Sequence, residues 1–198
     1  METFFIIIMV ATSVVGLTFI IERGLALRWS KVVPADIVTA ANKCRTAADL
    51  PMLHGICEKN QSSLARLLLA AENHLDLPKE ENEDAMQTRA RQELVRLERG
   101  LVVLEIVVGI APLMGLVGTI YGMMTLFGGL GQTGVGDNAV LAKGISYILQ
   151  FTMMGLLIAI PSLIAWSYYN KKVEMLAVEM ESVCSEFLRR QYQDSGKK

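Results

Sequence analysis

The sequence is poor in the residues on which several classes of soluble protein depend. It has three cysteines, without a C-x-x-C pair, and two histidines in 198 residues. A disulfide framework and a zinc-ribbon spacing are therefore excluded, and little is left for a metal site. Basic and acidic residues nearly cancel, at 19 against 20, so the chain lacks the clustered positive charge that nucleic-acid binding needs. We expect no metal and no cofactor.

Three stretches of the chain lack charged residues altogether. They cover 3–21, 106–136 and 144–170, in a sequence that is 52% hydrophobic with a mean hydropathy of +0.38. A helix needs about 20 residues to cross a hydrocarbon layer about 30 Å thick, and a soluble protein would interleave charged and apolar residues at the helical period. The sequence therefore predicts an all-α, polytopic membrane protein with three transmembrane helices.

The positions of lysine and arginine predict the orientation of these helices. Twelve lie within 22–105, six follow position 170, and Lys143 is the remaining one. Since Lys and Arg near the ends of spans favour the cytoplasm, we expect the N-terminus outside and the C-terminus inside. A cleaved signal peptide is the alternative for 3–21, but it would carry cations before its apolar run, whereas Glu2 precedes this one and Arg23 follows it.

These patterns divide the chain into segments. We expect a first transmembrane helix with its N-terminus outside (1–22), a cytoplasmic helical region (23–100), a second transmembrane helix (101–127), a periplasmic loop (128–143), a third transmembrane helix (144–170), and a cytoplasmic C-terminal helix and tail (171–198).

The charged regions show helical patterns. Helices are expected at 36–44, 46–59, 62–77 and 79–99, with Ser62 or Ser63 as an N-cap. After Pro78 no strong breaker occurs until Pro112, so 79–127 is expected to form one nearly continuous helix, about 74 Å long at 1.5 Å per residue. An apolar seam from Val173 to Leu188 extends the third helix likewise. Two of the transmembrane helices are therefore expected to reach far into the cytoplasm, the third packing on other helices or on a neighbouring subunit.

Small residues recur at helical spacing within the second and third spans. In lipid, close backbone approach at such residues is the main means of helix packing. The residues expected to pack helices are Ala111, Pro112, Gly115, Gly118, Gly122, Gly155, Ala159 and Pro161.

Hydroxyl groups are the other recurring feature of these spans. A hydroxyl in a span either bonds to its own helix or lines a polar path, and the sequence leaves both open. Candidate residues for lining an ion path are Thr119, Ser146, Tyr147, Thr152 and Ser162. No Asp, Glu, Lys, Arg or His lies in the middle of a span, and such residues usually mark ion paths. A proton carrier would therefore come from a partner, and an intramembrane enzyme, which needs a nucleophile–base pair or His/Asp ligands, is not expected.

The second and third spans resemble those of a known family. The run APLMGLVGTIYGM at 111–123 is similar to the second-span signature of the ExbB/TolQ/MotA family, and 144–156 with Ala159-Ile160-Pro161 and Asn170 looks like its third span. Weaker similarity covers 57–71 and the first span ending in Glu22-Arg23. The likeness extends over most of the chain, and three spans look like the ExbB/TolQ branch, since MotA-type stators have four.

The resemblance implies an ion-channel and motor subunit of the bacterial inner membrane. In the family several copies, typically five, form a ring around a dimer of single-span ExbD/TolR-type partners. A partner aspartate is protonated and deprotonated inside the ring, facing threonines that map onto Thr119 and Thr152. Such a subunit is not an enzyme. It uses the proton or sodium motive force to energise an envelope process such as transport, with a TonB/TolA-like protein as a further partner.

One position departs from the family pattern. ExbB and TolQ carry a glutamate in the third span where this chain has Tyr147, and a phenol keeps its proton near neutral pH. Either the partner's aspartate suffices with the threonines and water, or the coupling ion differs, or the driven process differs. A passive membrane scaffold or adaptor and a MotA-type stator subunit remain alternatives to this motor.

Overall fold

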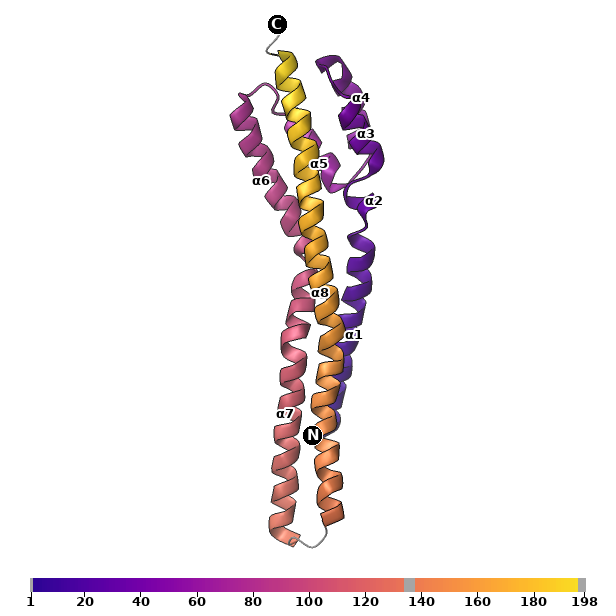
Figure 1. The fold of residues 1–198 in the computed structure, drawn as a ribbon, viewed down its shortest axis with the longest axis vertical. Coiled ribbons are helices and arrows are strands. Elements are labelled where there is room, and N and C mark those ends of the chain that lie inside the picture. The colour runs from indigo at the N-terminus through magenta and orange to yellow at the C-terminus, as the bar shows by residue number, and fades with distance from the viewer. Residues whose placement is uncertain (1, 134–137, 196–198) are drawn as a thin grey trace. The chain divides into compact units, whose positions relative to one another are not determined.

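The computed structural model describes residues 2–133 and 138–195, and every regular element in these ranges is helical. The elements are α1 (Glu2–Ala26), α2 (Trp29–Val32), α3 (Ala35–Lys43), the 3-10 turn η1 (Ala47–Asp49), α4 (Leu50–Glu58), α5 (Ser63–Glu72), α6 (Lys79–Glu98), α7 (Leu101–Thr133) and α8 (Asn138–Ser195) (Figure 1). Three stretches are long and apolar enough to cross a membrane, namely Thr3–Ala26, Leu101–Gly129 and Leu141–Gln193. The expected all-α class with three apolar spans is confirmed for this part of the chain.

The chain forms two compact units. The first, here called the apolar unit, combines Met1–Arg23 with Gly100–Tyr168, and the second, the polar unit, combines Gly24–Arg99 with Tyr169–Lys198. Helix α8 contributes to both. The division separates the charge-free stretches from the charged ones, as their composition leads one to expect.

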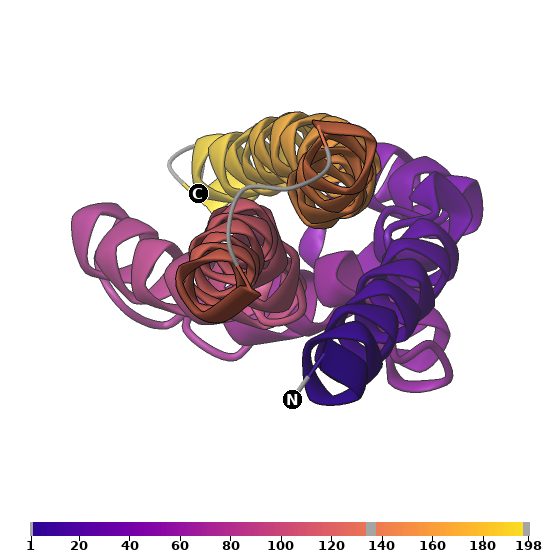
Figure 2. The same cartoon turned by 90° about the horizontal axis from the view of Figure 1, so that it is seen from below.

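In the apolar unit α1, α7 and α8 lie side by side (Figures 1 and 2), and α7 approaches α8 at glycines. A Cβ atom built on Gly155 would lie 2.6 Å from the carbonyl oxygen of Ala111, and one on Gly115 would lie 2.8 Å from the carbonyl oxygen of Phe151. Both distances are shorter than real Cβ atoms allow, so the two backbones can approach this closely only because these positions lack side chains.

The ends of α7 and α8 extend beyond the spans expected from the sequence. Helix α7 continues to Thr133 and α8 begins at Asn138, so helix covers most of 128–143, expected as a loop, and 134–137 lie outside the described residues. Glycine disfavours a helix without forbidding it, and 128–143 contain no proline. Pro112 and Pro161 lie inside α7 and α8 without ending either helix.

The nearly continuous helix expected over 79–127 is interrupted. Helix α6 ends at Glu98 and α7 starts at Leu101. Within the apolar unit the Arg23 guanidinium lies against Gly100, in space that a Cβ atom would occupy. Glycine is a poor helix former, and the absence of a side chain at Gly100 leaves room for Arg23. The sequence around Gly100 does not predict this packing contact.

The polar unit packs its short helices on the C-terminal part of α8. The predicted cap of α5 is confirmed, because the Ser62 hydroxyl accepts a hydrogen bond from the Ala65 amide at 3.2 Å. Helix α5 ends at Glu72, shorter than the expected 62–77, and turns follow it. The apolar seam of α8 is buried at Val173, Leu176, Met180, Val183, Cys184, Phe187 and Leu188. In this unit the seam therefore packs on helices of the same chain.

All three cysteines are free and buried, namely Cys44, Cys57 and Cys184. Burial, with the nearby Glu72 carboxylate, raises the pKa of Cys57 to about 11. Burial also raises the pKa of Cys44. Both thiols therefore stay protonated at neutral pH and act as small apolar side chains.

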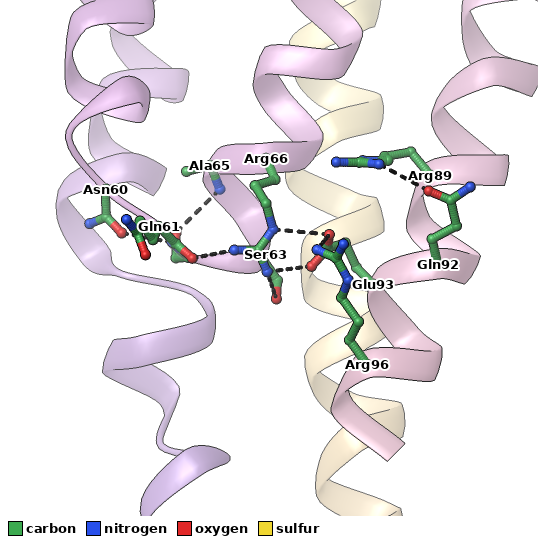
Figure 3. Close-up of polar contacts among 10 residues, drawn as sticks. Asn60, Gln61, Ser63, Ala65, Arg66, Arg89, Gln92, Glu93 and Arg96 are labelled. Atoms are coloured by element: carbon green, nitrogen blue, oxygen red, sulfur yellow. Dashed lines mark hydrogen bonds and ion pairs between the residues drawn. The ribbon is translucent and has the colours of Figure 1, made fainter. Parts of the chain in front are cut away.

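The polar unit also buries one carboxylate, Glu93 of α6, whose side chain is fully buried. Arg66 of α5 donates to it from Nε at 2.9 Å and from Nη2 at 2.5 Å, and Arg96 donates from Nη1 at 3.0 Å (Figure 3). Arg66 also donates to the Gln61 carbonyl and to the Ser63 hydroxyl. This cluster connects the N-terminal part of α5 to the C-terminal part of α6.

The environment of Glu93 acts on its pKa in opposite directions. Burial alone raises the pKa, but the hydrogen bonds and charge of Arg66, with Ser63 and Arg96, lower it below the usual glutamate value. A carboxylate with a lowered folded pKa stabilises the fold above its unfolded pKa, and this stability is lost as the pH falls through the folded value.

We predict that Glu93→Gln lowers the free energy of unfolding by about 1–3 kcal/mol, because it leaves Arg66 without its charged acceptor. Unfolding in detergent, followed by the tryptophan fluorescence of Trp29 and Trp166, measures the loss. The difference from wild type should be complete near neutral pH and shrink below about pH 4. Glu83→Gln is the control, because its ion pair with Lys79 lies at the surface and should change stability by less than about 0.5 kcal/mol. Equal losses in the two variants would contradict the assignment.

We also predict that Gly155→Ala weakens the α7–α8 contact, because the new methyl group would overlap the Ala111 carbonyl. The midpoint of thermal unfolding in detergent, measured by circular dichroism, should fall. Gly109→Ala provides the control, since a Cβ atom there meets nothing within 4 Å and should leave the midpoint unchanged or raise it. A Gly155→Ala protein as stable as this control would disprove the packing role.

Candidate functional site

Two threonines from different helices line one open groove of the apolar unit. Thr119 comes from α7 and Thr152 from α8, and the groove is here called the threonine groove. Its other lining residues are apolar, namely Met123, Ile145, Ile148, Leu149, Met153 and Leu156.

The glycine contact explains why these two threonines meet. A Cβ atom on Gly115 would lie 3.1 Å from the Cα atom of Thr152, so the helices touch at this level. Thr119 follows Gly115 by four residues, which places it one turn further on the same side of α7. The helix contact thereby brings both hydroxyls to a common surface.

The two hydroxyls differ in their hydrogen bonding. The Thr119 hydroxyl donates to the Leu116 carbonyl of its own helix at 2.7 Å. The Thr152 hydroxyl makes no hydrogen bond to any residue within 2–133 or 138–195. Of the two alternatives left by the sequence, Thr119 adopts the bond to its own helix, and the Thr152 hydroxyl is the one available to a ligand.

The threonine groove contains no titratable side chain. None of its lining residues is acidic or basic, and within the described ranges no group of three or more His, Cys, Asp or Glu could hold a metal ion. Taken alone, this part of the groove can solvate or hydrogen-bond an ion or an acid, but it cannot exchange a proton.

The other candidate hydroxyls lie elsewhere. Ser162 is buried, its hydroxyl donates to the Ile158 carbonyl at 2.8 Å, and its Oγ lies near the position of a Cβ on Gly16 of α1. Ser146 is exposed. Tyr147 lines a different cavity, packing edge-on against Phe151 with ring centroids 5.7 Å apart. The structure therefore brings together only Thr119 and Thr152.

The small residues of the spans lie between α7 and α8, with two exceptions. Cβ atoms on Gly118 and Gly122 would meet the side chains of Phe151 and Ile148 at 3.0 and 2.7 Å. Ala111 and Gly155 approach through the backbone, as described above, and Ala159 is buried. Pro112 is half-buried and Pro161 is exposed.

Two features of these surfaces were missed from the sequence. The apolar lining of the threonine groove by Met123 and Leu156 could have been found, because each lies four residues, about one helical turn, after its threonine. The contact of Phe5 with Tyr121, at a centroid distance of 5.6 Å, joins positions 116 residues apart and gives no local signal.

Comparison with known proteins places this architecture in a family. Residues 59–182, more than half of the chain, match the model of the MotA/TolQ/ExbB proton channel family. The biopolymer transport protein ExbB of Salmonella typhimurium is 29% identical over 143 residues, which cover 68% of this chain and 59% of that protein.

Two further relatives show similar likeness. The Tol-Pal system protein TolQ of Pseudomonas aeruginosa is 35% identical over 52% of this chain and 45% of its own length. A putative biopolymer transport protein, ExbB-like 1, of Synechocystis sp. is 32% identical over 78% of this chain and 62% of its own length. The chain thus spans less than two thirds of these relatives. It belongs to the MotA/TolQ/ExbB proton channel family.

Proposed function

We propose that this chain is an energy-transducing channel subunit of the bacterial inner membrane, in which the threonine groove faces a carboxylic acid supplied by a partner. The observation that carries the proposal is the meeting of Thr119 and Thr152 in an open groove without an ionisable side chain of its own. The family match and the relatives named ExbB and TolQ support it.

In this proposal the partner is a single-span ExbD/TolR-like protein with an aspartate at the depth of the groove. Several copies of the chain, five in the ring that we propose, surround it. The groove offers weakly polar hydroxyls to the protonated acid, and water at its open side solvates the charged form. Because the wall carries no cation, it does not trap the carboxylate in one state.

The driving force comes from the ion gradient. One charge crossing the membrane releases about 2.3 kcal/mol per 100 mV, enough to bias the partner between neighbouring grooves. Five copies around a dimeric partner give the ring and the partner different symmetries. Each protonation of the partner's aspartate would therefore move the partner by one step, from one groove to the next. We propose that the driven process is an envelope process such as transport, through a TonB/TolA-like protein. A threonine hydroxyl can hydrogen-bond a protonated acid or coordinate a sodium ion, so the groove is compatible with coupling to either ion.

The topology follows the charge asymmetry of the sequence. We place the N-terminus in the periplasm, 128–143 at the periplasmic side, and both 23–100 and 171–198 in the cytoplasm. The polar unit, with its charged surface and buried thiols, suits this compartment. A passive scaffold would need the same spans and glycine contacts, but it would have no use for hydroxyls on an open groove.

We predict that Thr152→Val reduces ion conduction by about tenfold or more, because it removes the hydroxyl that is free to bond the partner's acid while preserving side-chain shape. The measurement is proton uptake by proteoliposomes containing the chain and its partner. Thr152→Ser should restore conduction. Thr18→Val is a matched control, since its hydroxyl bonds the Val14 carbonyl of α1. Full conduction by Thr152→Val would remove the role assigned to this residue.

We predict that co-expression with the product of an adjacent gene yields a complex that contains more copies of this chain than of its partner. Native mass spectrometry gives the ratio, for which we expect five to two. The partner should contain one apolar span with an aspartate inside it. Purification of a stable ring whose centre is filled by its own side chains would instead favour the scaffold.

A further inference from the structure

A second cavity of the apolar unit has a different character from the threonine groove. It has a volume of about 180 Å³, and three helices form its wall. The lining residues are Phe5 of α1, then Gly118, Tyr121, Gly122, Thr125 and Leu126 of α7, then Gly144, Tyr147, Ile148 and Phe151 of α8. This set is called the aromatic cavity below.

The aromatic cavity is apolar apart from three hydroxyls. Two ring pairs form part of its wall, Phe5 with Tyr121 and Tyr147 with Phe151. The Thr125 hydroxyl is occupied, because it donates to the Tyr121 carbonyl at 3.0 Å. Neither phenol hydroxyl bonds to another residue in the ranges that the structure describes. The cavity thus offers apolar walls together with two available hydrogen-bond donors.

Its depth follows from the lengths of the helices. The lining begins at Gly118 and ends at Leu126 on α7, three residues before the apolar stretch Leu101–Gly129 ends. At 1.5 Å per residue it covers about 12 Å of one leaflet. Phe5 in the first turn of α1 and residues 144–151 of α8 meet this same end of α7. Tyrosine is enriched at such levels, where its ring lies in hydrocarbon and its hydroxyl reaches the ester and headgroup layer.

We propose that the aromatic cavity binds one acyl chain of a membrane phospholipid, whose ester carbonyls accept hydrogen bonds from Tyr121 and Tyr147. An apolar cavity does not hold water well and accepts an apolar guest, and lipid is the apolar guest at this depth. Lys143, exposed and adjacent to Gly144, offers a cation to the lipid phosphate. The proposal needs only the membrane location and is independent of the motor function.

Photo-crosslinking tests this binding. The full-length protein is expressed in cells, purified in mild detergent with lipid added, and exposed to a phosphatidylethanolamine that carries a diazirine on one acyl chain. Peptide mass spectrometry then locates the adducts. We expect them to concentrate on the segments that contain Phe5, Tyr121 and Phe151.

Two variants separate the cavity from the general lipid surface. Thr125→Phe fills the cavity and should reduce these adducts by about tenfold, the effect of losing about 1.4 kcal/mol of binding. Met124→Phe is the matched control, since Met124 is 70% exposed and does not line the cavity; it should leave the adducts unchanged. Replacing both tyrosines by phenylalanine keeps the rings but removes the two donors, so labelling should fall severalfold.

The outcomes decide the proposal in either direction. Adducts spread evenly over exposed positions such as Leu113 and Met124, and insensitive to Thr125→Phe, would mean surrounding lipid only. Adducts that are absent from these residues in the assembled oligomer, while other exposed positions are labelled, would mean that a neighbouring subunit fills the cavity. Circular dichroism and gel filtration check that each variant folds, and if Thr125→Phe does not, the double tyrosine variant decides alone.

Discussion

Backbone contact between α7 and α8 is the constraint on which the rest of the apolar unit depends. Helices in lipid gain nothing by hiding apolar surface from each other, so their association requires atoms to come close. Gly115 and Gly155 permit this approach, since a methyl group at either would strike a carbonyl of the other helix. The register so fixed determines which side chains share a surface, and the pairing of Thr119 with Thr152 results from it.

The polar unit is held together by different interactions, an apolar core and a buried cluster of charged side chains. The unit contains most of the charged residues and packs around an apolar core, in which Phe187 and Leu188 of α8 are among the most deeply buried residues. Within the polar unit Glu93 carries a buried charge that three hydrogen bonds, two from Arg66 and one from Arg96, stabilise. A buried charge of this kind adds little net stability, but it penalises any packing that separates Arg66 from it.

Short-range patterns predicted much of this architecture. The three apolar spans, the Ser62 cap and the buried seam of α8 each depend on residues within a few turns of one another. The sequence did not predict the pairing of Arg66 with Glu93, because 27 residues separate them along the chain. The sequence did not predict the helix break at Gly100 for a similar reason, because the contact made there is with Arg23, which is distant along the chain. For the site, the sequence selected both threonines, but only packing shows that Ser162 and Tyr147 lie elsewhere.

The three buried cysteines make the protein convenient for spectroscopy. Their sulfur atoms are enclosed, and the reagents used for attaching fluorophores or spin labels act on exposed thiolates. A single cysteine introduced at an exposed position would therefore be the one reactive handle in the folded chain, with no need to remove Cys44, Cys57 or Cys184. Distances between copies in the ring that we propose could then be measured without removing any native cysteine.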